Sequence, residues 1–154
     1  MNLPEFDFKI RKENGKHQIF DRIRKTFVAL TPEEWVRQNM VSYLIDCLAY
    51  PDSRIANEVS INVNGLAKRC DTVIYDNSFC PLVIAEYKAE TVELTQKVFD
   101  QAAVYNQKLD VPYLLVSNGR NHLFCYVDKA NRRFRFEEQI PDYRTLTDRQ
   151  VLRG

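Results

Sequence analysis

The clearest pattern along the chain is a pair of short apolar runs separated by turn-forming residues. The runs are Thr72 to Tyr75 and Leu82 to Ala85, and Asp76 to Pro81 lies between them. This pattern is typical of a β-hairpin whose strands are well buried. The sequence therefore predicts a central hairpin.

Antiparallel pairing predicts which residues face one another across this hairpin. The expected register sets Tyr75 opposite Leu82 and, at the open end, Asp71 opposite Glu86. Side chains on a strand alternate with a period of two, so Lys88 is expected on the same face as Glu86. Opposed carboxylates are destabilising and favour a compensating cation, which Lys88 or a metal ion could supply. An ordinary salt bridge at a strand end is the alternative.

A first amphipathic helix is indicated after the first 30 residues of the chain. Thr31 can cap it, Pro32 suits its first position, and Glu34 is expected to complete a capping box. Its apolar line predicts a helix to about Tyr50, with Arg37 on the same line. A charged side chain there needs a partner, which could be an active-site carboxylate, a substrate phosphate or solvent.

A second helix is predicted from Glu93 to Lys108. Gln101 and Tyr105 are four residues apart and therefore share one face, in line with Leu94 and Val98. A glutamine on a buried stripe requires hydrogen bonds. The alternative is a polar pair at the rim of the packing face.

The remaining periodicity favours strands. They are expected at residues 57–63, 111–117, 122–127 and 132–136, with an N-terminal hairpin turning at Asn14 and Gly15 and a short helix at residues 145–152. Glu58 alternates away from Val59 and Ile61, so it is either an exposed edge residue or a neighbour of the Asp71 and Glu86 pair. The element order gives an αββαβ core around a mixed β-sheet in the α/β class.

Composition narrows the function classes. The 154 residues are ordinary for a globular domain, and the net charge of +1 gives no strongly basic footprint. Four cysteines without a Cys-x-x-Cys pair disfavour a zinc site, and Cys47 and Cys125 are expected to be buried. Basic residues gather near both ends of the chain and could meet phosphates or simply face solvent. No apolar run is long enough to span a bilayer, and a cytoplasmic location is expected.

An ordered series of motifs resembles a known family. The series is Thr31 to Gln38, Glu58, Arg69-x-Asp71, Glu86-x-Lys88, Gln101-x-x-x-Tyr105 and Ser117 to Gly119. It resembles the N-terminal nuclease domain of type I restriction enzyme R subunits, in the PD-(D/E)XK nuclease superfamily, over roughly residues 17–127. The resemblance implies a restriction-endonuclease-like fold in a single domain, with an N-terminal extension at residues 1–30, a core at 31–127 and a C-terminal strand and tail at 128–154.

The resemblance also implies a chemistry. It implies hydrolysis of DNA phosphodiester bonds with Mg²⁺, or Mn²⁺, as cofactor. The implied metal ligands are Asp71, Glu86 and the backbone carbonyl of Tyr87, and Lys88 would orient or deprotonate the attacking water. The resemblance implies Glu58 as a further catalytic residue, and Arg37, Gln101 and Tyr105 as supporting residues.

Partners follow from the same resemblance. The translocase domains of the subunits that the chain resembles do not fit in 154 residues, which leaves three alternatives: a free-standing nuclease, a module that needs a restriction-modification or motor partner encoded separately, or a repurposed domain. The alternative function is a non-cleaving nucleic-acid-binding or partner-dependent module on the same fold. The sequence leaves open the choice of DNA or RNA, strand preference and oligomeric state.

Overall fold

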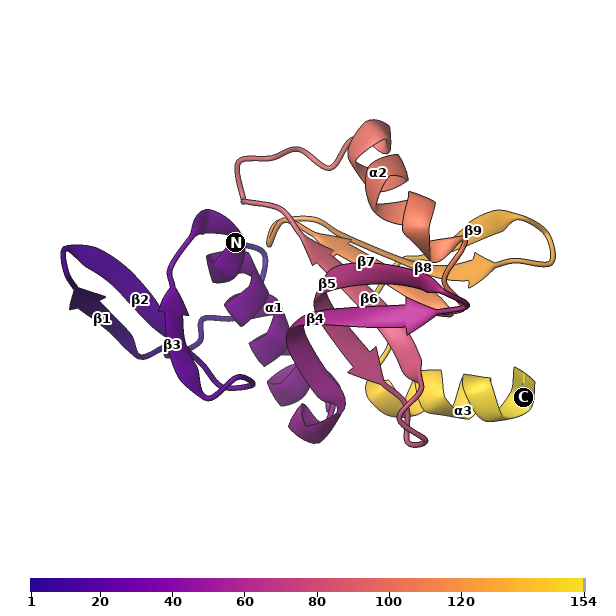
Figure 1. The fold of residues 1–154 in the computed structure, drawn as a ribbon, viewed down its shortest axis with the longest axis horizontal. Coiled ribbons are helices and arrows are strands. Elements are labelled where there is room, and N and C mark those ends of the chain that lie inside the picture. The colour runs from indigo at the N-terminus through magenta and orange to yellow at the C-terminus, as the bar shows by residue number, and fades with distance from the viewer. Residues whose placement is uncertain (154) are drawn as a thin grey trace.

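The structure is a computed structural model that describes residues 1–153, apart from the side chains of Val63 and Tyr105. It contains two β-sheets and three α-helices (Figure 1). The small sheet consists of β1 (Ile10–Glu13), β2 (Lys16–Asp21) and β3 (Thr26–Ala29). The large sheet consists of β4 (Ile55–Val63), β5 (Leu66–Tyr75), β6 (Pro81–Tyr87), β7 (Tyr113–Ser117), β8 (His122–Asp128) and β9 (Arg133–Glu137). The helices are α1 (Pro32–Leu48), α2 (Gln96–Asn106) and α3 (Tyr143–Arg153), and a single 3₁₀ turn spans Asp52–Arg54.

The six strands of the large sheet lie side by side in chain order. Every neighbouring pair is antiparallel except β6 and β7, which are parallel and joined through α2. A parallel connection requires such a crossover, which is right-handed in nearly all proteins. The αββαβ order of α1, β4, β5, β6, α2 and β7 and the mixed sheet expected from the sequence are confirmed.

Helices cover both faces of the large sheet (Figure 1). On one face, α1 and α3 pack through apolar residues such as Leu44 and Leu146, which are fully buried. On the other face, α2 packs through Phe99, Ala102 and Ala103. β6 and β7 are apolar on both sides because they lie between these layers, as is usual for central strands that are covered on both faces.

The cap of α1 is partly as expected. The Thr31 hydroxyl accepts a hydrogen bond from the Glu34 N–H at 3.1 Å, and Pro32 occupies the first helical position. The second half of the capping box is absent, and that expectation was wrong. The Thr31 N–H donates to the Ala29 carbonyl instead, which leaves the Glu34 carboxylate available to bind arginines.

The hairpin register is confirmed at the open end and wrong at the turn. Val73 lies opposite Ile84, as expected, but Tyr75 lies opposite Pro81 rather than Leu82. Leu82 is the extra residue of a bulge in β6. The cause is the turn at residues 76–80, where the Asp76 carboxylate accepts hydrogen bonds from two backbone N–H groups and closes a loop with an odd number of residues.

The N-terminal hairpin is confirmed, with Asn14 and Gly15 both at positive φ in its turn. A third strand, β3, was missed because four residues give too short a period to recognise. Residues before β1 also contact α1, where the rings of Phe8 and Trp35 meet edge to face at a centroid distance of 5.4 Å.

Two further expectations concern burial. Cys125 is buried as expected, but Cys47 is exposed. Cys47 lies in the last turn of α1, where Asp46 beside it is also exposed and the helix no longer packs fully on the sheet. Among the residues described, no helix is long and apolar enough to cross a membrane.

The packing of α3 can be tested with two leucines on the same helix. Leu146 is fully buried, whereas Leu152 is 87% exposed. Leu146→Ala should lower the free energy of unfolding by about 2–5 kcal/mol, because it leaves a cavity in the core. Leu152→Ala should change it by less than about 0.5 kcal/mol. Urea unfolding measures both, and equal effects would contradict the docked position of α3.

Candidate active site at the open end of the β5–β6 hairpin

Two carboxylates meet at the open end of the central hairpin. Thr72 pairs with Ala85, so Asp71 and Glu86 occupy the next position of the register on adjacent strands. The Asp71 carboxylate accepts a hydrogen bond from the Tyr87 N–H at 2.9 Å. The convergence of Asp71 and Glu86 that the hairpin register predicts is therefore present.

Glu86 is poorly solvated. Its side chain is only 16% exposed. Burial, and then the negative charge of Asp71, raise the pKa of Glu86 to about 7, and the attraction of Lys68 offsets this only in part. A carboxylate pair in this state gains stability from a bound proton or an added cation.

The nearest cation to Glu86 was missed in the sequence. The Lys68 ammonium forms an ion pair with the Glu86 carboxylate, and its side chain is only 13% exposed. Lys68 lies three residues before Asp71, so strict alternation would place the two side chains on opposite faces of β5.

The alternation fails because the side chains of β4 and those of β5 switch from one face of the sheet to the other at the same position. Ile55 packs with α1 and α3, whereas Val59 and Ile61, an even number of residues further along β4, pack on the opposite face. Between them lies Glu58, whose φ of 53° is in the left-handed region. Regular pairing on both sides sets Glu58 opposite Asp71, with no bridge between the two.

The same reversal is visible on β5. Cys70 and Val73 belong to one core cluster although they are three residues apart. Lys68 lies two residues before Cys70 on β5, so the two side chains share a face. This is also the face that carries Glu86. A positive φ at a non-glycine residue gives little sequence signal, so the sequence could not reveal this contact.

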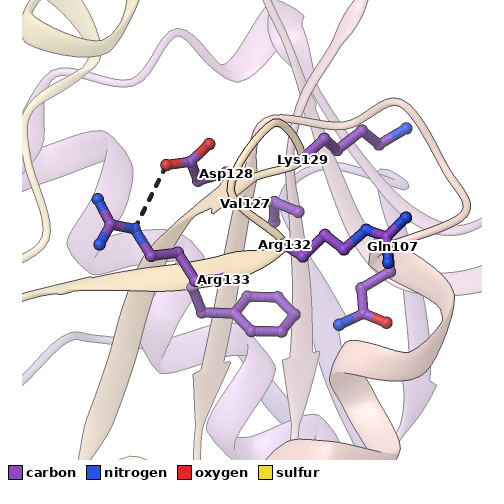
Figure 2. A pocket seen from close by; sticks show the side chains of 7 residues that line it. Gln107, Val127, Asp128, Lys129, Arg132 and Arg133 are labelled. Carbon is purple, nitrogen blue, oxygen red and sulfur yellow. Dashed lines mark ion pairs between the residues drawn. The ribbon is translucent and has the colours of Figure 1, made fainter.

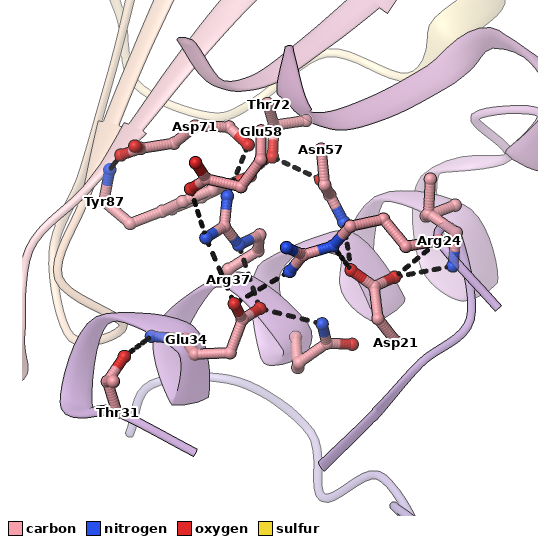
Figure 3. A network of polar contacts seen from close by, with 12 residues as sticks. Asp21, Arg24, Thr31, Glu34, Arg37, Asn57, Glu58, Asp71, Thr72 and Tyr87 are labelled. Atoms are coloured by element: carbon pink, nitrogen blue, oxygen red, sulfur yellow. Dashed lines mark hydrogen bonds and ion pairs between the residues drawn. The ribbon is translucent and has the colours of Figure 1, made fainter. Parts of the chain in front are cut away.

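Arg37 joins helix α1 to both strands at this reversal (Figure 3). Its Nε donates to Glu34 at 2.9 Å, its Nη2 to Glu58 at 2.7 Å, and its Nη1 to the backbone carbonyl of Asp71 at 2.5 Å. The sequence left a carboxylate, a phosphate or solvent open as the partner of Arg37. The structure shows carboxylates, those of Glu34 and Glu58. Burial alone would lower the pKa of Arg37, but the two carboxylates outweigh it and hold that pKa above its ordinary value.

Glu58 is neither an exposed edge residue nor a direct partner of Glu86. Its side chain is 28% exposed and binds Arg37 on one side and Arg69, at 3.1 Å, on the other. Burial opposes the charge of Glu58, but hydrogen bonds from these arginines lower its pKa. Glu58 therefore stays ionised beside the backbone of Asp71.

The polar network continues away from the carboxylate pair (Figure 3). Arg24 bridges Glu34 at 2.8 Å and Asp21 at 2.5 Å. Asp21, at the end of β2, also accepts from the Asn57 amide at 3.0 Å. Contacts from Asn57 to Thr72 and from Thr72 to the Tyr87 hydroxyl return to β6. The N-terminal sheet is thereby linked to the candidate site.

The remaining candidate residues are less engaged. Lys88 follows β6 directly, and its N–H donates to the Ser117 carbonyl at 2.9 Å. Its ammonium has no ion pair or hydrogen bond to any residue whose placement is described. Gln101 is exposed, so its place on a buried stripe was wrong; the buried face of α2 runs through Phe99 and Ala103 instead.

The expectation for Tyr105 concerns a side chain that lies outside the described residues, so its position beside Gln101 stays a prediction.

The donor set fits a hard divalent cation. Within residues 1–153, with the exceptions given above, no three His, Cys, Asp or Glu side chains converge into a metal site. Mg²⁺ does not need three, since it commonly keeps several waters and binds through one or two carboxylates. Asp71 and Glu86 offer two such groups, and Tyr87, the last residue of β6, follows Glu86 directly. The negative charge of Asp71 and Glu86, which Lys68 compensates only in part, is the observation that favours such an ion.

The fold and the paired carboxylates define the class. An αββαβ core with acidic residues at the open end of its central hairpin is the arrangement of the restriction-endonuclease-like fold. The chain belongs to the family described as type I restriction enzyme R protein N terminus, whose sequence profile matches residues 32–141.

A solved structure agrees with this assignment. The fold is similar to that of a fragment described as an HsdR subunit of a type I restriction enzyme from Vibrio vulnificus YJ016, with a TM-score of 0.57 and 18% sequence identity. The similarity covers 79% of this chain and 25% of that chain, so this chain spans about a quarter of that protein's length. A search of curated proteins found no match.

Two arginines that bind Glu58 provide a matched test of the network. Arg37→Met should lower the free energy of unfolding by about 3–5 kcal/mol, because it removes the buried cation that binds Glu34 and Glu58 together and leaves them only Arg24 and Arg69. Arg69 is 65% exposed, and Arg69→Met should cost about 1 kcal/mol or less. Chemical denaturation at neutral pH measures both. A small loss in Arg37→Met would mean that the network contributes little to stability.

The pKa of Glu86 predicts a dependence of stability on pH. Its folded-state pKa is raised from 4.5 to about 7, so the folded chain holds a proton that the unfolded chain releases within this range. The stability from this proton is present below pH 4.5 and is lost as the pH rises through 7. In metal-free buffer the loss between pH 4.5 and 8 should exceed that of Glu86→Gln by on the order of 1–3 kcal/mol. Parallel slopes in urea unfolding would exclude the raised pKa.

Proposed function

We propose that this chain is a metal-dependent nuclease that hydrolyses DNA phosphodiester bonds. The observation that carries the proposal is the partly buried Asp71 and Glu86 pair, in which burial and then the negative charge of Asp71 raise the pKa of Glu86 to about 7. Incompletely compensated negative charge of this kind, where two neighbouring strands meet, is typical of a site that works with an added cation. Membership of the type I restriction enzyme R family supports the same activity.

Asp71, Glu86 and the Tyr87 carbonyl would hold Mg²⁺ or Mn²⁺. When bound, the ion would stabilise negative charge on the phosphate oxygens and lower the pKa of a bound water. The chain's own contribution is to fix its ligands. The Tyr87 N–H bond to Asp71 fixes one carboxylate, and the Arg37 bond to the Asp71 carbonyl fixes the strand that bears it.

Lys88 is assigned to the attacking water. Its ammonium lacks a partner among the described residues, so it can donate to a water or a phosphate oxygen without breaking an ion pair. Its backbone bond to Ser117 extends the pairing of β6 with β7 and fixes where the side chain starts. We assign Arg37 and Glu58 to positioning the Asp71 backbone, and Gln101 and Tyr105 to supporting contacts with DNA.

A second candidate function is a non-cleaving module that binds nucleic acid. The observation that favours it is the ion pair of Lys68 with Glu86, which supplies a cation from the chain itself. A separately encoded motor or modification partner is compatible with either function.

Cleavage assays separate these functions. Supercoiled plasmid and single-stranded DNA should be cut with Mg²⁺ or Mn²⁺ and remain intact in EDTA. Lys88→Ala should reduce the rate by about 10²-fold or more, as expected for loss of a group that assists proton transfer. Lys97→Ala, which removes an exposed lysine on α2, is the matched control and should cut normally.

Three results would decide the matter. Equal cleavage by Lys88→Ala and the unmodified chain would exclude the assigned role of Lys88. Absence of cleavage, together with no heat of Mn²⁺ binding by calorimetry, would favour the non-cleaving module. Mn²⁺ binding that disappears in Asp71→Asn would support the carboxylate pair as the metal site.

A further inference from the structure

A hollow apart from the candidate active site lies at the end of the large sheet that is far from Lys88. It has a volume of about 420 Å³ and sits between the turn that joins β8 to β9 and the C-terminal end of α2 (Figure 2). Three cations line it, namely Lys129, Arg132 and Arg133, together with the ring of Phe134 and the amide of Gln107. The hollow is therefore suited to an anion that also has an apolar part.

The cations differ in how they are held. Asp128 forms an ion pair with Arg133 at 3.5 Å and accepts two hydrogen bonds from Asn131, which fixes the turn. Lys129 pairs only with Asp110, whose side chain is 70% exposed. The Arg132 guanidinium has no ion pair or hydrogen bond to any part of the chain that is described. Arg132 can thus bind a ligand without giving up an existing contact.

Phe134 gives the hollow a rigid wall. Its ring meets that of Phe99 on α2 edge to face, with the centroids 5.2 Å apart. An aromatic wall beside guanidinium groups matches the two parts of a nucleotide, because the cations suit the phosphate and the ring suits the sugar or base.

The hollow opens on the same face of the sheet as Glu86. Glu86 lies beside Val116 on β7, and paired residues of neighbouring strands share a face. Val116 and Val127 belong to the same core cluster beneath α2, and Val127 pairs with Phe134. Because α2 also packs on this face, a polyanion that contacts both places has to pass over or beside that helix.

The separation of the two places suits a DNA strand. The Pro112 carbonyl accepts a hydrogen bond from the Val127 N–H. Pro112 lies four residues before Val116, which is a distance of about 13 Å along the strand. The two or three strand spacings from β6 to β8 and β9 add about 10–14 Å sideways. The resulting distance of about 15–20 Å is shorter than one helical turn of a duplex, which is about 34 Å.

We propose that this hollow binds a backbone phosphate of the same DNA, within one helical turn of about 34 Å from the phosphate at the Asp71 and Glu86 pair. Arg132, Arg133 and Lys129 are the donors. The choice of DNA rests on the proposed function, but binding at the hollow requires neither a metal ion nor cleavage.

Binding in EDTA tests the hollow apart from the chemistry. A labelled 20-base-pair duplex is titrated with protein between 50 and 200 mM salt and followed by fluorescence anisotropy. Arg132→Gln should weaken binding about 3–10-fold, and Arg132→Gln/Arg133→Gln further. Each removed contact should reduce the slope of log affinity against log salt by about 0.9.

The control removes a charge from the other face. Arg144 is 91% exposed on α3, which packs on the opposite side of the sheet, and Arg144→Gln should bind within about twofold of the unmodified chain. Unchanged affinity and slope in the double variant, or equal losses in Arg144→Gln, overturn the proposal. If the unmodified chain cleaves DNA and the double variant binds DNA normally, the proposed phosphate site is excluded and the nuclease function is retained. If the unmodified chain does not cleave DNA but the variants show the expected losses of binding, the nuclease function is excluded and the proposed phosphate site is retained.

Discussion

The buried guanidinium of Arg37 is the interaction on which the rest of the candidate site depends. It connects α1, β4 and β5 through Glu34, Glu58 and the Asp71 carbonyl. A charge with a side chain only 8% exposed is tolerated in a protein only when it is paired on every side. Its partners are therefore fixed in direction as well as in distance. This requirement places the Asp71 backbone, and through it the carboxylate that faces Glu86.

The change of face at Glu58 and Asp71 has an electrostatic consequence. A regular ladder would have placed Arg69, and not Lys68, on the face of β5 that carries Asp71 and faces Glu86. The reversal brings Lys68 to Glu86 and turns Glu58 toward arginines instead. The structure thus divides three acidic residues between two kinds of environment. Glu58 is neutralised by arginines of the scaffold, and the Asp71 and Glu86 pair is only partly neutralised by a lysine.

Much of the fold could be predicted from the sequence because burial dictates it. The apolar runs of β5 and β6 predicted a hairpin and set Asp71 beside Glu86, and the cap at Thr31 predicted the start of α1. The errors arise where side-chain chemistry overrides periodicity. Asp76 closes a turn with an odd number of residues and shifts the end of the hairpin by one residue.

The candidate site was predictable only in part. The ionic partners Asp21, Arg24 and Lys68 were missed because they depend on long-range geometry that spacing along the chain does not encode. Gln101 was placed on the packing face because Leu94 and Val98 suggested that stripe, whereas the aromatic ring of Phe99 determines how α2 rotates on the sheet.

The contact between Phe8 and Trp35 has an optical consequence. Trp35 is the single tryptophan of the chain, and it lies on the first turn of α1 beside Glu34. The residue that packs on its ring comes from the segment before β1, outside the large sheet. Indole emission responds to the polarity around the ring, so the fluorescence of the unlabelled protein reports whether the N-terminal segment is docked on α1. Detachment of that segment would shift the emission while the far-ultraviolet circular dichroism of the large sheet stayed unchanged.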